Sequence, residues 1–228
     1  MFMYMRAPFR NALCGFATVT AAACLWISGP AAATPITVVN FSFEAPALAD
    51  GGFNFGPVTG WTVFGTSGVF NPTVGQMSQG PSDGLQVAYT NNIGLALTQD
   101  LIAVLVANTL YTLTVDIRSR TDGFTHQSST LQLRTAADAI LATATQGALA
   151  GGTNATLTAT FLAGALDPNL GSNLKIALIG GGNQSDWDNV HLDAVLQTNN
   201  RVPEPGTLAL LGLGLAGLTL RRRRAAGK

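Results

Sequence analysis

The sequence predicts an all-β fold, an antiparallel β-sandwich of the jelly-roll type, between an N-terminal signal helix and a C-terminal transmembrane helix. Short runs of alternating apolar and polar residues recur through the middle of the chain, turn-forming residues separate them, and helical periodicity is rare there. Both ends instead carry an uncharged apolar stretch beside arginines. We therefore expect a signal peptide, a sandwich domain, a linker with a sorting motif, a transmembrane helix and a basic cytoplasmic tail, at residues 1–33, 34–198, 199–206, 207–220 and 221–228.

Residues 1–33 have the three parts of a secretory signal peptide. Arg6 and Arg10 precede the apolar run 12–27, and a string of small residues with an A-x-A pattern follows it. We expect signal peptidase to cleave after this string, so that the mature chain begins near Thr34. The alternative is an uncleaved membrane anchor.

The middle segment contains four clear strand patterns. Residues 110–118 alternate apolar and polar side chains without interruption, and the same period of two recurs at 155–161, 174–178 and 190–196. The apolar run 101–106 fits either a buried strand or a short helix, because periodicity does not separate the two. Turn signals lie between these runs, at 50–52, 122–123, 151–152, 167–168 and 180–182. Many short alternating strands are typical of a sandwich or jelly roll.

Residues 207–220 have the composition of a short transmembrane helix. They contain no charged side chain and are rich in Leu, Ala and Gly. As an α-helix they reach about 20 to 25 Å, slightly less than a hydrocarbon core, so they cross only a thinned bilayer or with help from their flanks. The basic run that follows favours a cytoplasmic end by the positive-inside rule, and the signal peptide delivers the rest across the membrane.

The C-terminal segment also resembles the PEP-CTERM sorting signal of Gram-negative bacteria. Pro203, Glu204 and Pro205 precede the apolar helix. Four arginines follow it, Arg221, Arg222, Arg223 and Arg224. The resemblance implies cleavage near the PEP triplet by an exosortase-type membrane protease, and two prolines keep that backbone extended and accessible. We therefore expect a precursor anchored in the inner membrane that then reaches the cell surface or the extracellular matrix.

Charge and cysteine content narrow the function classes. The two cysteines, Cys14 and Cys24, lie in the predicted signal peptide, so the mature chain forms no disulfide and depends on its core or on a metal. Residues 34–198 carry eleven acidic and four basic side chains, a net charge of −7. Because phosphate binding requires clustered Lys and Arg, this balance excludes nucleic acid as a partner. The carboxylates are available to a hard cation such as Ca²⁺.

Two polar stretches bracket the middle segment. The first reads NFSFE from Asn40 to Glu44, and the second reads SDWDNV and contains Asp186 and Asp188. Together they resemble carbohydrate-binding-module-like jelly rolls, in which an opening N-x-S-F-E strand lies near a closing D-N-V strand. The resemblance implies a structural Ca²⁺ held by Glu44 and Asp188 with backbone carbonyls, and it makes Asn40 and Asp186 weaker ligand candidates. The alternative is that these carboxylates are ordinary solvent-exposed strand ends.

A closer resemblance within that group is to the calcium-dependent hapalindole-type (Stig) cyclases. In such cyclases an aromatic-lined pocket binds an indole-bearing terpenoid, and a carboxylic acid starts the cyclisation. The resemblance implies that Tyr89, Phe124 and Asp188 face a corresponding cleft. An Asp188 that binds calcium would be ionised and a poor proton donor, so its two roles conflict. The resemblance rests on blocks in the same order along the domain, 44–52, 60–61, 71–73, 83–84, 87–89, 108–113, 120–123 and 188–190.

Three function classes follow. We prefer an exported, calcium-stabilised module without catalytic residues. It would bind a glycan such as extracellular polysaccharide or be a component of the extracellular matrix. We prefer this class because fold does not determine function and such sorting tails are common on non-catalytic exported proteins. Trp61 would then stack on a sugar or an indole, unless it packs in the core. The alternatives are a cyclase-like enzyme acting on an indole or terpenoid molecule, and a structural protein of the envelope.

Overall fold

The computed structural model describes residues 32–197 together with Gly212 and Leu213. Eleven β-strands lie in this part of the chain. Their bounds are β1 (Thr34–Ile36), β2 (Thr62–Val63), β3 (Ser67–Phe70), β4 (Val87–Thr90), β5 (Ile93–Val104), β6 (Thr109–Arg118), β7 (Ser129–Thr135), β8 (Ile140–Gln146), β9 (Asn154–Ala163), β10 (Asn173–Gly181) and β11 (Ser185–Leu196).

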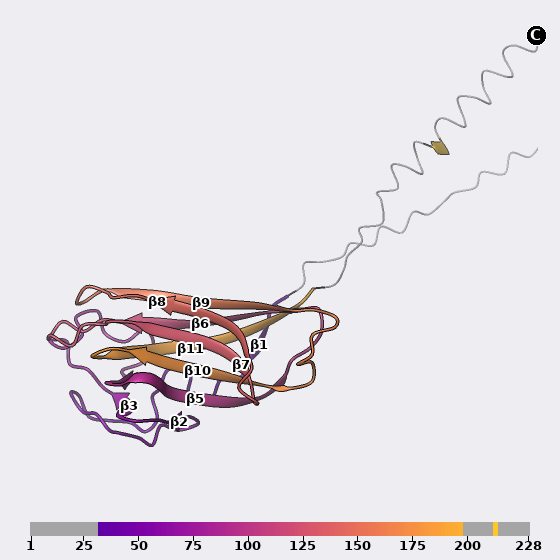
Figure 1. Cartoon of the computed structure of the whole chain (residues 1–228). Helices are drawn as coiled ribbons and strands as arrows, with labels where there is room; N and C mark the ends of the chain where they lie inside the picture. The colour runs from indigo at the N-terminus through magenta and orange to yellow at the C-terminus, as the bar shows by residue number, and fades with distance from the viewer. Residues whose placement is uncertain (1–31, 198–211, 214–228) are drawn as a thin grey trace, which may run out of the picture.

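The strands form two antiparallel sheets that pack into a sandwich (Figure 1). The first sheet has the order β3-β4-β11-β6-β9, with β1 paired beside the second half of β11. The second sheet has the order β2-β5-β10-β7-β8. This architecture confirms the predicted all-β antiparallel fold.

All four predicted strand patterns are strands in the structure, and most extend by a few residues. The ambiguous run 101–106 is strand as far as Val104, within the long β5. One turn signal was misplaced, because Gly180 and Gly181 still belong to β10. At Gly180 a Cβ atom would lie 2.5 Å from the Asn92 carbonyl oxygen. The glycine therefore allows the backbones of residues 180 and 92 to lie close together, and it does not form a turn.

The core lies between the two sheets. Leu113, Ile117 and Trp187 of the first sheet face Leu97 and Ile176 of the second, and all five are fully buried. Their spacing along each strand is the period of two that the sequence shows. The sequence therefore determines which face of each strand points inward.

A β-bulge in β11 decides which of its side chains face outward. Asp188 pairs with Asp116 of β6, but His191 pairs with Thr114, so β11 contains one extra residue between the two pairs. Asn189 in this bulge has a φ of 55°. Because the bulge shifts the alternation, Asp186 and Asp188 share the outer face with His191, while Trp187 and Val190 both point into the core.

The connection between β3 and β4 covers the outer face of the first sheet. It runs from residue 71 to residue 86, and we call it the covering loop. Beneath it Phe70, Val87 and Tyr89 form a second, smaller apolar cluster with Met77 of the loop. The loop explains why Asp186 and Asp188, on the outer face, are almost completely buried.

Several predicted segments lie outside the described residues. They are the signal peptide up to residue 31, the linker with its sorting motif, the basic tail, and the predicted transmembrane helix apart from Gly212 and Leu213, which are helical. Within residues 32–197 and 212–213, no helix is long and apolar enough to cross a membrane.

Candidate functional site

Glu44 and Asp188 converge on the end of the covering loop. The Asp188 Oδ2 atom accepts hydrogen bonds from the backbone N–H groups of Ser82 and Asp83, at 2.5 and 2.9 Å. The Glu44 Oε1 atom accepts two more, both at 2.8 Å, from the N–H groups of Leu85 and Gln86. Two carboxylates 144 positions apart thus bind neighbouring amides of one loop.

The chain near Glu44 also contacts the middle of β11. The Val190 N–H donates to the Phe41 carbonyl at 2.9 Å, so the opening segment and the last strand lie side by side. Burial raises the pKa of Asp188 to about 7, although the loop N–H groups and Arg118 lower it. A cation beside this carboxyl would keep it ionised.

This arrangement is compatible with a calcium ion but does not show one. All side-chain ligands it offers are oxygen atoms, as Ca²⁺ prefers, and Glu44 Oε2 has no hydrogen-bond partner among the described residues. No group of three or more His, Cys, Asp or Glu side chains in residues 32–197 has the geometry of a metal site. An ion here would therefore take most of its ligands from backbone carbonyls.

Asn40 has a different role in the structure from that of a ligand. Its amide accepts from the Ala45 N–H at 3.0 Å and donates to the carbonyl oxygens of Ala45 and Thr59 at 2.8 and 3.1 Å. These bonds close the turn that carries Glu44, and Asn40 itself adopts a φ of 50°. The amide therefore positions Glu44, and the geometry does not favour it as a metal ligand.

A cavity of about 280 Å³ opens at the other end of the covering loop. One side of it, which we call the aromatic wall, consists of five rings. These are Phe53, Phe55, Phe70, Tyr89 and Phe124. Phe70 and Tyr89 are 3% and 4% exposed and form the floor, whereas the other three are 43% to 60% exposed and form the rim. The Tyr89 hydroxyl donates to the Asn54 carbonyl at 2.8 Å, which fixes its ring.

Three polar side chains, Gln76, Arg120 and Gln184, also line the cavity, and we call them the polar wall. The Arg120 guanidinium lies between two rings of the aromatic wall, with Cζ 4.5 Å from the Phe70 centroid and 4.8 Å from that of Phe124. Such cation–π contacts hold the guanidinium plane against the rings and leave its edge available for hydrogen bonds.

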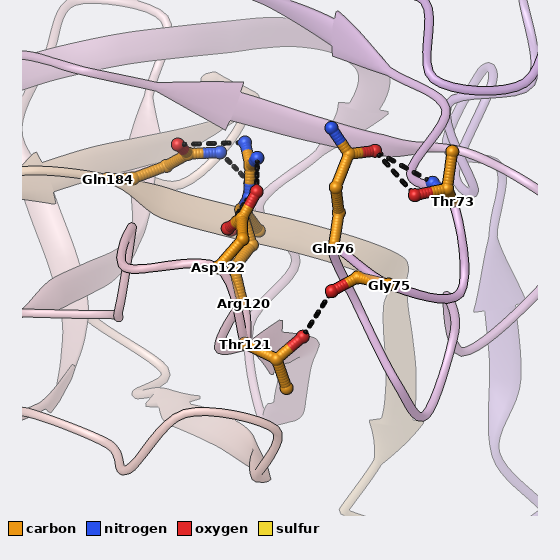
Figure 2. A network of polar contacts seen from close by, with 8 residues as sticks. Thr73, Gly75, Gln76, Arg120, Thr121, Asp122 and Gln184 are labelled. Carbon is orange, nitrogen blue, oxygen red and sulfur yellow. Dashed lines mark hydrogen bonds and ion pairs between the residues drawn. The ribbon is translucent and has the colours of Figure 1, made fainter.

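Hydrogen bonds fix the polar wall from behind (Figure 2). Arg120 forms a bidentate ion pair with Asp122, in which Nε lies 2.9 Å from Oδ1 and Nη2 contacts Oδ2. Its Nη1 donates to Gln184 Oε1 at 3.2 Å. Partial burial opposes the ionisation of Asp122, but the hydrogen bond and charge of Arg120 lower its pKa. These bonds hold the guanidinium in place, and Arg120 is only 8% exposed.

Thr121 ties the covering loop to the segment that carries Arg120. Its N–H donates to the Gln76 carbonyl at 2.9 Å. Its hydroxyl donates to the Gly75 carbonyl, also at 2.9 Å (Figure 2). The two halves of the polar wall are thus held together by direct bonds. The cavity is accordingly pre-formed in the described structure.

Asp186 lies directly behind the polar wall. Its Oδ1 accepts a hydrogen bond from Gln184 Nε2 at 2.8 Å, whereas its buried Oδ2 has no partner among the described residues. Burial raises the pKa of Asp186 to about 7, although Gln184 and Arg120 lower it. Burial and the charge of Asp186 together raise the pKa of Tyr89 to about 12. Of the two aspartates of β11, Asp186 and not Asp188 therefore lies next to the cavity wall, and Asp122 is another carboxyl that contacts a cavity residue.

The structure brings together only some of the predicted site residues. Tyr89 and Phe124 both line the cavity, while Asp188 does not. Trp61 is 7% exposed, packs against Phe43 at 5.2 Å between ring centroids, and donates from Nε1 to the Val39 carbonyl. The expectation that Trp61 stacks on a ligand therefore conflicts with its place in the core.

Sequence reasoning missed most of the polar wall. Arg120 lies in one of the blocks that carry the cyclase resemblance, which is the sequence signal that points to it. Gln76 and Gln184 lie in polar turns, where nothing in the sequence separates a cavity residue from an ordinary loop residue.

The family model described as HpiC1 cyclase matches residues 34–193, more than two thirds of the chain. The chain belongs to this family. This match confirms the cyclase resemblance that the sequence motifs indicated. No protein of curated function matches the chain significantly.

Solved Stig cyclases have the same fold as this HpiC1-like chain. The cyclase Fisc from Fischerella sp. TAU, in complex with (3Z)-3-(1-methyl-2-pyrrolidinylidene)-3H-indole, is 29% identical, with a TM-score of 0.63 over 72% of this chain and 98% of that one. A Fischerella sp. TAU cyclase in complex with 4-(1H-indol-3-yl)butan-2-one is also 29% identical, with a TM-score of 0.62 over 71% and 97%.

The likeness to carbohydrate-binding modules is more distant. The CBM22-1 xylan-binding domain from Paenibacillus barcinonensis is 14% identical, with a TM-score of 0.41 over 74% of this chain and 97% of that one. Similarity at this level carries no argument about a ligand of the HpiC1-like domain.

A second family model, the PEP-CTERM protein-sorting motif, matches residues 201–224. This match confirms the predicted sorting signal. The motif indicates an exported protein that is anchored in the membrane, processed by an exosortase and sorted to the surface.

Proposed function

We propose that the exported domain binds a small molecule with an aromatic ring in the cavity between the aromatic and polar walls. One observation carries this proposal: five aromatic side chains gather around one cavity that also contains a buried guanidinium. A cavity of about 280 Å³ is near the lower end of ligand-site sizes. Its size and apolar lining favour a compact ligand over a polysaccharide chain, and its presence argues against a purely structural role.

The relatives support an indole as the aromatic group. Two structures of Fischerella sp. TAU cyclases, each 29% identical to this chain, contain a bound indole compound. An indole ring is large and electron-rich, so it stacks well on exposed rim rings such as those of Phe53 and Phe124. We therefore propose an indole-bearing ligand for this cavity as well.

Removal of one rim ring tests the proposal. We expect Phe124→Ala to weaken binding of 4-(1H-indol-3-yl)butan-2-one about tenfold, because it removes one stacking partner and loosens Arg120. The measurement is isothermal titration calorimetry of the full chain. Phe64→Ala is the matched control, since Phe64 is 38% exposed but lies outside the cavity. Equal effects of the two variants would contradict the proposal.

We also propose that a structural Ca²⁺ ties Glu44 and Asp188 to the covering loop. The oxygen-only side chains, the unpartnered Glu44 Oε2 and the burial of Asp188 support this proposal. Bound calcium would supply charge that keeps the Asp188 carboxyl ionised despite its burial. The chain itself holds Glu44 through Asn40 and the loop amides, and that part of the arrangement does not depend on the ion.

A second candidate function is catalysis by the same cavity. Asp186 favours catalysis. Its carboxyl is buried, one oxygen has no partner among the described residues, and the other accepts a hydrogen bond from Gln184 of the cavity wall. Such a carboxyl is a source of a proton for cyclisation of a bound indole or terpenoid. Gln184 stands between Asp186 and the cavity, which favours binding without turnover. The two functions differ in whether a bound substrate is converted.

We propose that the sorted protein functions outside the cell. Signal peptidase would release residue 34 as the new N-terminus, exosortase would cleave near Pro203, and the domain would then remain at the surface or in the extracellular matrix of a Gram-negative bacterium. The PEP-CTERM match supports this path. Mass spectrometry of the mature protein tests both cleavage positions.

A further inference from the structure

The Gln76 side chain presents a hydrogen-bond donor to the cavity. Its Oε1 accepts from the N–H and hydroxyl of Thr73, at 2.9 and 3.0 Å. A backbone N–H can only donate, so this contact identifies the oxygen of the amide and leaves the nitrogen at the other position. Nε2 has no acceptor among residues 32–197, and in Figure 2 it is turned away from Thr73, toward the side of Arg120.

The Gln184 amide, in contrast, is occupied at both ends. Its oxygen accepts from Arg120 and its nitrogen donates to Asp186, at 3.2 and 2.8 Å. Because Arg120 can only donate, this contact also determines the orientation of the amide. Gln184 therefore shapes the polar wall and leaves Gln76 and Arg120 to meet a ligand.

Arg120 retains donors after its own contacts are satisfied. A guanidinium has five N–H groups, and the described contacts with Asp122 and Gln184 use three of them. One N–H remains on each terminal nitrogen. The guanidinium lies against the rings of Phe70 and Phe124, which favours approach of a ligand along the edge where these N–H groups lie.

We propose that the polar wall selects ligands that carry a hydrogen-bond acceptor, such as a carbonyl oxygen, on an aromatic body, with Gln76 and Arg120 as the specificity-determining donors. This inference rests on the proposed function and adds the chemical class of ligand. Gln76 and Arg120 both offer unused donors to the cavity, while the aromatic wall accommodates the ring. A ligand without an acceptor would leave those donors unpaired in a partly buried site, which disfavours its binding.

Two compounds that differ in one oxygen test this selection. The first is 4-(1H-indol-3-yl)butan-2-one, and the second is 3-butyl-1H-indole, which has the same skeleton without the carbonyl. Calorimetric titration into the full chain gives a Kd for each. We expect the preference for the ketone, expressed as the ratio of the two Kd values, to fall about tenfold in Gln76→Glu and in Arg120→Met.

The variants separate selectivity from folding. Gln76→Glu keeps the side-chain oxygen that accepts from Thr73 and replaces only the N–H donor, so the covering loop should keep its structure. Arg120→Met removes the ion pair with Asp122, so Gln76→Glu is the variant that tests selectivity without that change. Gln197→Glu makes the same change just beyond the C-terminal end of β11 and should leave the ratio unaltered. An unchanged ratio in both cavity variants would overturn the inference alone. Failure of both compounds to bind the wild type would overturn the proposed function as well.

Discussion

Asp186 and Asp188 leave the same face of β11 and enter two different environments. Asp188 accepts backbone N–H groups at the end of the covering loop, whereas Asp186 accepts one side-chain donor behind the cavity. Two residues of strand, about 7 Å, separate the backbone positions of the two aspartates. The conflict between metal binding and acid catalysis in one residue is thus resolved by assigning the roles to two carboxyls.

Asp186→Asn distinguishes a catalytic cavity from one that only binds. Asparagine keeps an oxygen for Gln184 and lacks a transferable proton, so we expect the Kd of 4-(1H-indol-3-yl)butan-2-one to stay within about twofold. If the cavity is catalytic, conversion of an indole-bearing terpenoid should fall at least about 100-fold. Liquid chromatography of the reaction measures this. Conversion at the wild-type rate would exclude Asp186 as the acid.

Side-chain roles could be predicted only where a strand motif or a family resemblance marked them. Tyr89 and Phe124 were placed near a cleft by the cyclase resemblance, and both line the cavity. Trp61 was assigned to a ligand because exposed and core tryptophans look alike in sequence. Gln76 lines the same cavity as Arg120 because the covering loop folds over the sheet, and no local pattern encodes that placement.

The covering loop is the element on which both candidate sites depend. Its last residues bind Glu44 and Asp188, and its first part supplies Gln76 to the cavity. Anything that detaches the loop should therefore affect the proposed metal position and the ligand cavity together.

Gly84→Ala should detach the end of the covering loop. A Cβ atom on Gly84 would lie 2.3 Å from Glu44 Oε1 and force that carboxylate away from the loop amides, and the φ of +68° adds strain. We expect a loss of about 2 kcal/mol or more in the free energy of unfolding, measured by chemical denaturation.

Gly80→Ala is the matched control for that variant. Gly80 has a φ of +65° in the same loop, but nothing lies within 4 Å of its added Cβ. Backbone strain alone should cost about 1 kcal/mol. A cost for Gly84→Ala no larger than that for Gly80→Ala would show that Glu44 does not hold the loop.

Chelation tests the proposed calcium ion at the same loop. An ion bound only by the folded state stabilises it by mass action, so we expect EGTA to lower the Tm of the full chain by several degrees and added Ca²⁺ to restore it. Glu44→Gln, which keeps an oxygen for the loop amides, should reduce this response. A Tm that is insensitive to EGTA would refute the calcium proposal.

At the scale of the whole molecule, the cavity lies far from the ends of the described domain. Thr34 pairs with Ala194, so β1 and the end of β11 lie together at one end of the sandwich (Figure 1). Gln184 and Asp186 lie at the start of β11, about 30 Å away along the strand. A tail that continues from residue 197 therefore begins opposite the cavity.

The fold was predictable because strand alternation and burial have the same physical cause. Each apolar residue at a period of two had to face a common core, and the order of elements then permits few arrangements. The bulge at Asn189 was not predictable, since the sequence does not show where the alternation shifts. That single extra residue places His191 on the same outer face as Asp186 and Asp188.

A crystal structure of the full chain soaked with 4-(1H-indol-3-yl)butan-2-one tests the central claim most directly. We expect the indole ring between the floor and the rim of the aromatic wall, with the carbonyl oxygen within hydrogen-bond distance of Gln76 Nε2 or Arg120. A cavity without ligand at saturating concentration, or an indole bound at another surface, would contradict the account.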